Sequence, residues 1–97
     1  MKAKILKETE KAIQLTFGCE IYGEHFTVKS AWFPKSQIEI TSNIDGKIEF
    51  MPKNDWILNA KVREYCQYIA ETFPNVKTEI KLYLSGANNY KVDYCYA

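Results

Sequence analysis

Residue patterns that mark common enzyme and metal sites have no counterpart in this chain. It contains one histidine, His25, and three widely spaced cysteines, Cys19, Cys66 and Cys95, with no C-x-x-C pair. Zinc sites normally need paired ligand spacing, and a nucleophilic triad needs a base beside the nucleophile and a group that orients it. The four glycines, at positions 18, 23, 46 and 86, are too dispersed for a phosphate-binding loop. We therefore expect no catalytic site, no metal and no cofactor.

An excess of charge and a long apolar run are missing as well. The 13 basic and 12 acidic residues leave a formal net charge of +1, which disfavours both a strongly basic nucleic-acid binder and an acidic mimic of DNA, although local patches stay compatible with it. No apolar stretch approaches the length of a membrane span, and the charged stretch Met1–Lys7 is unlike a signal peptide. Dispersed cysteines are typical of a reducing compartment. We expect a cytoplasmic protein with no membrane contact.

What is present is the composition of one globular domain, covering residues 1–97, with 46% hydrophobic and 26% charged residues. Alternation of apolar and polar residues predicts short strands, separated by turn signals such as Asp45-Gly46. The predicted strands cover residues 3–6, 12–17, 26–33, 37–40 and 47–51. These strands favour an antiparallel meander, with curling into a small barrel as an alternative. Residues 19–22, between two glycines, are either a strand extension or a wide turn.

The period of the apolar residues changes after Pro52. From Trp56 onward a helical stripe recurs at spacings of four, three, four and four: Leu58, Val62, Tyr65, Ile69 and Phe73. This stripe predicts an amphipathic helix of about five turns. Alternation returns in residues 76–84 and 90–96, which predicts two further strands. The predicted order is β-β-β-β-β-α-β-β, an α+β domain with a small antiparallel, barrel-like or open sheet packed by one helix.

The stretch around Pro34 joins two of the predicted strands. Proline has no amide donor and fixes φ, so it suits the end or edge of a strand. A period of two places Phe26, Val28, Ser30 and Trp32 on one side of the first strand, and Thr27, Lys29, Ala31 and Phe33 on the other. Trp32 and Phe33 therefore face opposite sides, with one ring in the core and the other covering a neighbouring element or partly exposed.

Aromatic residues make up 14% of the chain. Rings interleaved with lysine on a sheet can stack on single-stranded bases, and Tyr and Trp are also frequent in protein–protein contacts. The competing interpretation is that these rings are good strand formers that fill a small core. As contact residues we single out one rim charge, Lys35, and five ring anchors: Trp32, Phe33, Tyr83, Tyr90 and Tyr94.

Several motifs in the first part of the chain resemble a known group of proteins. They are K-I-L-x-E-T-E-K-A-I at residues 4–13, W-F-P-K-S-Q at residues 32–37, and Pro52 followed by Trp56-Ile57. This order is similar to that of small uncharacterised proteins of phages, prophages and other mobile elements that share a W-x-P-K-S-Q motif. Asn54-Asp55 departs from the tight proline–tryptophan spacing of that group. The resemblance implies a mobile-element context and no particular mechanism.

Our leading hypothesis from the sequence is a non-enzymatic phage or mobile-element protein that binds a macromolecule. It would inhibit a host defence protein, in the manner of an anti-CRISPR protein, with a host protein or nucleoprotein complex as partner in the bacterial cytoplasm. The alternative is a single-stranded nucleic-acid-binding accessory protein of phage DNA metabolism. A structural homodimer formed through the last predicted strand is a third hypothesis.

Overall fold

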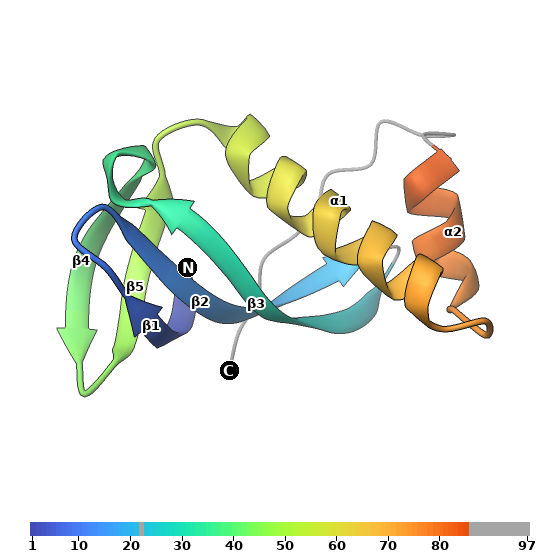
Figure 1. Cartoon of the computed structure of the whole chain (residues 1–97), viewed down its shortest axis with the longest axis horizontal. Coiled ribbons are helices and arrows are strands. Elements are labelled where there is room, and N and C mark those ends of the chain that lie inside the picture. Colours follow the sequence, from blue (N-terminus) through green and yellow to red (C-terminus); the bar gives the residue numbers. More distant parts are fainter. Residues whose placement is uncertain (22, 86–97) are drawn as a thin grey trace.

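The computed structural model describes residues 1–21 and 23–85, which form an open antiparallel sheet with helices packed on one face (Figure 1). The strand order across the sheet is β3-β2-β1-β5-β4. The α+β class is thus confirmed, but the sheet is not closed into a barrel, because β3 and β4 are its two edges. The elements in chain order are β1 (Lys2–Glu8), β2 (Ala12–Ile21), β3 (Glu24–Pro34), the 3-10 turn η1 (Lys35–Gln37), β4 (Ile38–Ile44), β5 (Lys47–Pro52), α1 (Asp55–Thr72) and α2 (Thr78–Ser85).

The connections follow the turn chemistry of the sequence. The β1–β2 hairpin closes with the Thr9 amide donating to the Ala12 carbonyl at 2.8 Å. The β4–β5 hairpin uses Asp45 and Gly46 with φ of 53° and 81°, the pair of positive values that a tight two-residue hairpin turn requires. Pro34 ends β3, and the η1 turn leads directly into β4, so the predicted proline corner is confirmed.

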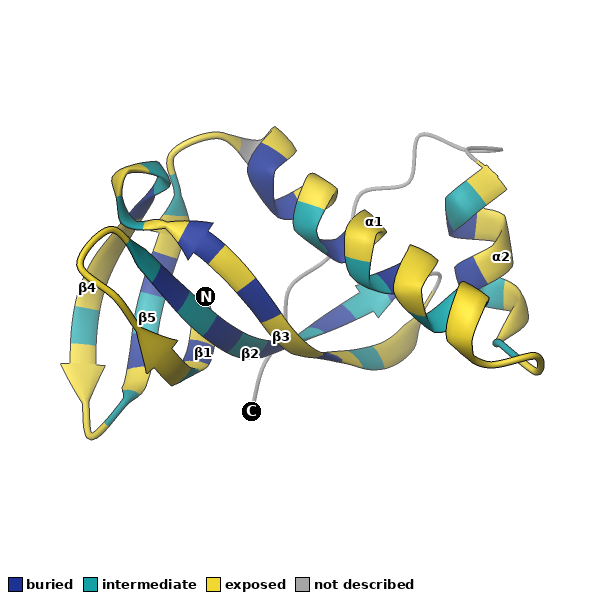
Figure 2. Cartoon of the chain, in the orientation of Figure 1, coloured by how far each residue is buried: buried dark blue, intermediate teal, exposed yellow. Residues whose placement is uncertain are grey.

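The core lies between the helices and one face of the sheet (Figure 2). On β2 every second residue is buried, from Ile13 to Ile21, so residues 19–21, whose structure the sequence left open, extend the strand. Three phenylalanines from three strands meet at the centre with ring centroids 5.8–6.3 Å apart: Phe17, Phe33 and Phe50. Most of the strand aromatics therefore fill the core.

A bulge in β3 changes which residues share a face. Leu15 pairs with Ala31 and Phe17 with Val28, so Thr16 is opposite two residues, Lys29 and Ser30. The extra residue reverses the alternation beyond it. The buried face of β3 therefore carries Val28, Ala31 and Phe33, and the predicted grouping of Val28 with Ser30 and Trp32 is wrong.

The strand predicted for residues 76–84 is also wrong, because residues 78–85 form the helix α2. The same residues satisfy a helical period as well as an alternating one: Ile80 and Tyr83 are buried and Val76 is half-buried, at spacings of four and three. Exposed Leu82, which alternation places with the buried residues, lies off this stripe. The predicted strand 90–96 lies outside the described residues.

Candidate functional site

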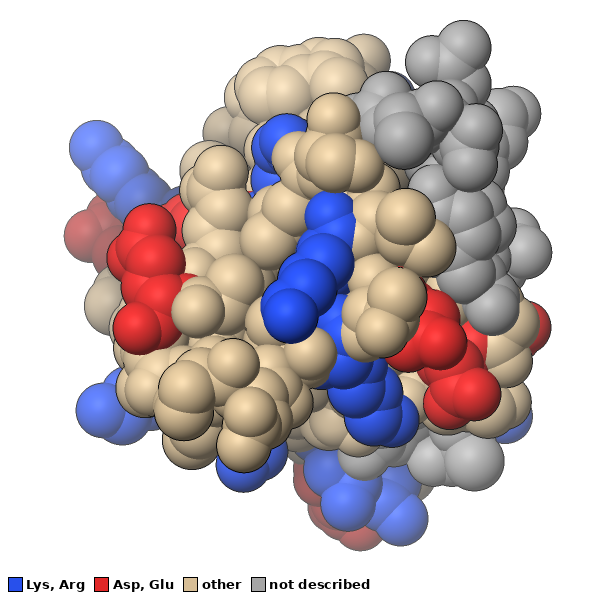
Figure 3. All heavy atoms as spheres, turned by 90° about the vertical axis from the view of Figure 1, so that its right-hand side faces the viewer, with Lys and Arg blue, Asp and Glu red and all other residues tan. Residues whose placement is uncertain are grey.

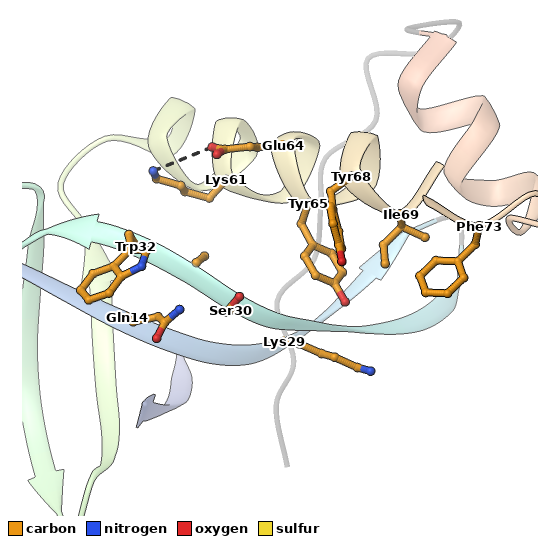
Figure 4. A pocket seen from close by; sticks show the side chains of 11 residues that line it. Gln14, Lys29, Ser30, Trp32, Lys61, Glu64, Tyr65, Tyr68, Ile69 and Phe73 are labelled. Atoms are coloured by element: carbon orange, nitrogen blue, oxygen red, sulfur yellow. Dashed lines mark ion pairs between the residues drawn. The ribbon is translucent and has the colours of Figure 1, made fainter. Parts of the chain in front are cut away.

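A groove runs between α1 and the outer side of the edge strand β3 (Figure 4). Its cavity volume is about 580 Å³, within the range of about 300–1,000 Å³ that ligand sites occupy. The sheet contributes Gln14 from β2 and, from β3, the bulge residues Lys29 and Ser30 followed by Ala31 and Trp32. The helix contributes Lys61, Glu64, Tyr65, Tyr68 and Ile69, and Phe73 follows directly after its last residue.

Tyr65 connects the helix to the bulge. A hydrogen bond with the backbone of Lys29 lowers the pKa of its hydroxyl, but burial outweighs this and leaves the pKa raised. The ring of Tyr68 is 6.3 Å from that of Tyr65, one helical turn along. At the other end of the groove, Lys61 Nζ lies 3.9 Å from Glu64 Oε2. The groove thus has an aromatic wall and both signs of charge.

Beside this groove, the backbone groups of Trp32 lie at the free edge of β3. The Lys35 amide donates to the Lys11 carbonyl at 2.8 Å, and Phe33 pairs with Ile13 two residues earlier. Because backbone groups in an antiparallel pair alternate in direction, the N–H and C=O of Trp32 point away from β2. No strand pairs with this side of β3 in the described part of the chain. Trp32 therefore offers one donor and one acceptor at the sheet edge.

The groove continues towards the α1–α2 connection as a second hollow of about 450 Å³, which shares Tyr65, Ile69 and Phe73 with the first. Lys77 covers part of it, with Nζ 5.0 Å from the centroid of the Phe26 ring and 3.8 Å from Glu24 Oε2. Viewed from this end of the molecule, basic side chains lie between two acidic groups, with uncharged surface around them (Figure 3). The surface at this end is mixed in charge.

Of the predicted contact residues that the structure describes, only Trp32 lines the groove. Its side chain is 39% exposed and lies opposite Gln14. Phe33 is fully buried in the phenylalanine cluster, so its prediction as a surface anchor is wrong. Lys35 lies on η1, where its amine forms an ion pair with Glu8 of β1, and it does not line the groove.

Of the predicted tyrosines, the structure describes only Tyr83. Tyr83 is 8% exposed beneath α1, its hydroxyl donates to the Asn59 carbonyl at 3.3 Å, and burial raises its pKa to about 12. It therefore supports the packing of α2 on α1, and its prediction as a surface contact is wrong. Tyr90 and Tyr94 lie outside the described residues.

The sequence pattern does not identify two groove residues, because the helical stripe predicts that its whole apolar face is buried. Phe73 belongs to that stripe but is 53% exposed, and Tyr68, which lies off it, is 57% exposed. The buried stripe runs instead through Leu58, Val62 and Cys66. The spacings of four and three between Lys61, Tyr65 and Tyr68 indicate that these residues share a second face of the helix.

In the described part of the chain, the histidine and the cysteines differ in exposure. His25 is exposed on β3, whereas Cys19 and Cys66 are buried, and burial raises the pKa of the Cys66 thiol to about 11. Within residues 1–21 and 23–85, no three His, Cys, Asp or Glu side chains lie together as a metal site would need. Over the same residues, neither helix has the length and apolar character of a membrane span.

Comparison of the chain with protein-family models, with curated proteins and with solved structures found no match.

Proposed function

We propose that this chain is a non-enzymatic binding protein that holds an extended segment of a partner protein in the α1–β3 groove. The segment would lie beside β3 as an added strand, with main-chain hydrogen bonds to Trp32 and side chains against the aromatic wall of α1. Strand addition of this kind derives affinity from the backbone and specificity from the pockets beside it.

The observation that carries the proposal is the outward-facing backbone of Trp32 at the mouth of a groove with exposed rings. Trp32 and Tyr68 supply large, rigid contact area, and Lys61 and Glu64 supply rim charges of both signs. Aromatic anchors surrounded by a polar rim are typical of protein contacts. The near-neutral net charge of the whole chain agrees with such a mixed surface.

The resemblance to mobile-element proteins guides the choice of partner. It favours a bacterial host defence protein, for example a CRISPR effector or its nucleoprotein complex, and an inhibitory role in the cytoplasm. The alternative hypothesis from the sequence is that the predicted rings stack on single-stranded nucleic acid. It has less support, because two of those rings, Phe33 and Tyr83, are buried.

To test the groove, random displayed peptides are selected for binding to the immobilised full chain. The affinity of the selected peptides is then measured for the wild type and for groove variants. We expect Trp32→Ala and Tyr68→Ala each to weaken binding about tenfold or more, as loss of an aromatic anchor does. Trp56→Ala is the matched control, because Trp56 is 65% exposed but does not line the groove. Selected peptides that bind both groove variants as tightly as the wild type would contradict the proposed site.

The inhibitory role needs a separate measurement. The chain is co-expressed with each of a panel of CRISPR effectors, and survival of a targeted plasmid is counted. We expect protection from one effector by the wild type and by Trp56→Ala, and loss of protection with Tyr68→Ala. If no effector is inhibited while peptides still bind the groove, the inhibitor role fails and the groove stands.

A further inference from the structure

Five lysines lie on the sheet face opposite the helices. On β1, Lys2 and Lys4 flank buried Ala3, and on β5, Lys47 precedes buried Ile48, so these lysines face away from the core. The register sets Lys4 directly beside both Lys47 and Thr16. Of the other two, Lys7 is beside Gln14. Lys29 is opposite Thr16, and its side chain extends away from α1 (Figure 4). We call this set, Lys2, Lys4, Lys7, Lys29 and Lys47, the lysine face.

No ion pair joins any lysine of this face to another described residue. Glu49, the acid beside Lys2 in the register, lies 2.9 Å from the amino nitrogen of Met1 instead. Like charges directly opposite on neighbouring strands destabilise a sheet, and Lys4 and Lys47 are such a pair. An anion bound between them would relieve this repulsion.

The spacing of the charges fits a chain of phosphates better than one small anion. With strands about 4.8 Å apart and a rise of about 3.3 Å per residue, Lys4 is roughly 5 Å from Lys47, 7 Å from Lys2 and 10 Å from Lys29 at the backbone. Lys2, Lys4 and Lys47 line a shallow hollow of about 410 Å³ together with Ser42, the exposed Ile44 and the acid Glu49. Flexible lysine side chains can follow several successive phosphates in such a surface.

The remainder of the face indicates the class of polyanion. Its centre is polar, with Gln14 and Thr16 between the lysines, whereas a surface that inserts into lipid needs a broad apolar area. Trp32 lies at its margin opposite Gln14 and is 39% exposed, and an exposed aromatic ring can stack on a base. Charge and stacking together are the combination that single-stranded nucleic acids require.

We propose that the lysine face binds the phosphate backbone of a single-stranded nucleic acid, with Trp32 stacking on a base at one end. This surface shares Gln14, Lys29 and Trp32 with the α1–β3 groove, whereas its other four lysines do not line that groove. The inference does not rest on the proposed protein partner. The sequence predicted that nucleic acid binds to a group of rings, whereas the site proposed here is a charged face of the sheet.

The test is fluorescence anisotropy of a labelled single-stranded oligonucleotide with the full chain, at low salt and at about 200 mM salt. Lys47→Glu sets a carboxylate opposite Lys4, so it should leave the melting temperature unchanged or higher while weakening binding about tenfold. Lys81→Glu is the control, because Lys81 is exposed on α2 and the charge change is identical. We expect it to change affinity less than twofold, about the effect of net charge alone.

Four outcomes would overturn the inference. They are an absence of binding at low salt, an equal loss in the Lys47→Glu and Lys81→Glu proteins, equal affinity for a duplex of the same sequence, and pelleting with anionic vesicles in place of oligonucleotide binding. A salt dependence that becomes shallower in Lys47→Glu but not in Lys81→Glu would support it, because each phosphate contact contributes to that slope.

Discussion

Trp32 and Phe33 are neighbours in the chain with opposite roles. Successive residues of a strand face opposite sides, so Phe33 enters the cluster with Phe17 and Phe50 while Trp32 remains 39% exposed beside the groove. The sequence predicts that the two rings separate, but it cannot assign them, because the bulge at Lys29 and Ser30 decides which side becomes the core.

Alanine substitutions at these two positions should therefore have different effects on stability. Phe33→Ala leaves a cavity in the packed centre and should lower the free energy of unfolding by about 3–5 kcal/mol. Trp32→Ala removes a ring that is partly in water and should cost less than about 1 kcal/mol, similar to the Trp56→Ala control. Urea unfolding followed by circular dichroism measures both. Similar losses at positions 32 and 33 would contradict the burial described above.

The thiol of Cys66 should make stability fall in alkaline solution. Burial raises its pKa from 9.0 to about 11, so between these values the folded protein retains a proton that the unfolded chain releases, and stability decreases as the pH rises. The full effect is at most about 3 kcal/mol for this shift. In Cys66→Ala the decrease from pH 9 to 11 should be smaller, whereas parallel curves for the two proteins would show that the thiol does not contribute.

At the scale of elements, α2 depends on one side chain of α1. The guanidinium of Arg63 donates to the Leu84 carbonyl at 2.7 Å and to the Tyr83 carbonyl at 3.4 Å, which satisfies acceptors in the last turn of α2. A cation at this end of a helix is also favoured by the helix dipole.

Arg63→Ala should loosen α2 without affecting the sheet. We expect amide hydrogen exchange in α2 to accelerate about tenfold, the effect of losing one charge-assisted hydrogen bond, while β2 amides keep their rates. Lys61→Ala is the control on the same helix, because its contact with Glu64 at 3.9 Å is a partly exposed pair of little energetic weight. Equal acceleration in both variants would indicate a general weakening of α1.

How far the sequence predicts the elements depends on the length of each pattern. The β-strands and α1 follow from alternation and from an apolar period sustained over many residues, and Asp45-Gly46 fixes one hairpin. The eight residues of α2 are too few for the pattern to separate a helix from a strand, so packing against α1 decides. The groove was predicted only at Trp32, because the exposure of Tyr68 depends on where α1 crosses β3.

At the scale of the whole molecule, two different surfaces meet along Gln14, Lys29 and Trp32. One is the mixed, aromatic groove between α1 and β3, and the other is the lysine face on the outside of the sheet. A near-neutral net charge conceals this arrangement, because the basic residues of one face are balanced by acids elsewhere. A partner that contains both protein and nucleic acid could engage the two surfaces together.

The two surfaces should separate by mutation. Tyr68→Ala should weaken peptide binding only, Lys47→Glu should weaken oligonucleotide binding only, and Trp32→Ala should weaken both, because its ring borders both surfaces. Each variant is measured against both ligands, with Trp56→Ala unchanged in either assay. A variant that loses both activities without involving Trp32 would mean that the surfaces are not independent.

Hydrogen exchange at the amide of Trp32 tests the central claim most directly. In the unbound chain this amide points away from β2 at an unpaired strand edge, and we expect it to exchange quickly. Addition of a groove-selected peptide should slow its exchange about tenfold or more, because an added strand takes the open donor. Tight peptide binding with no change at the Trp32 amide would contradict strand addition at the α1–β3 groove.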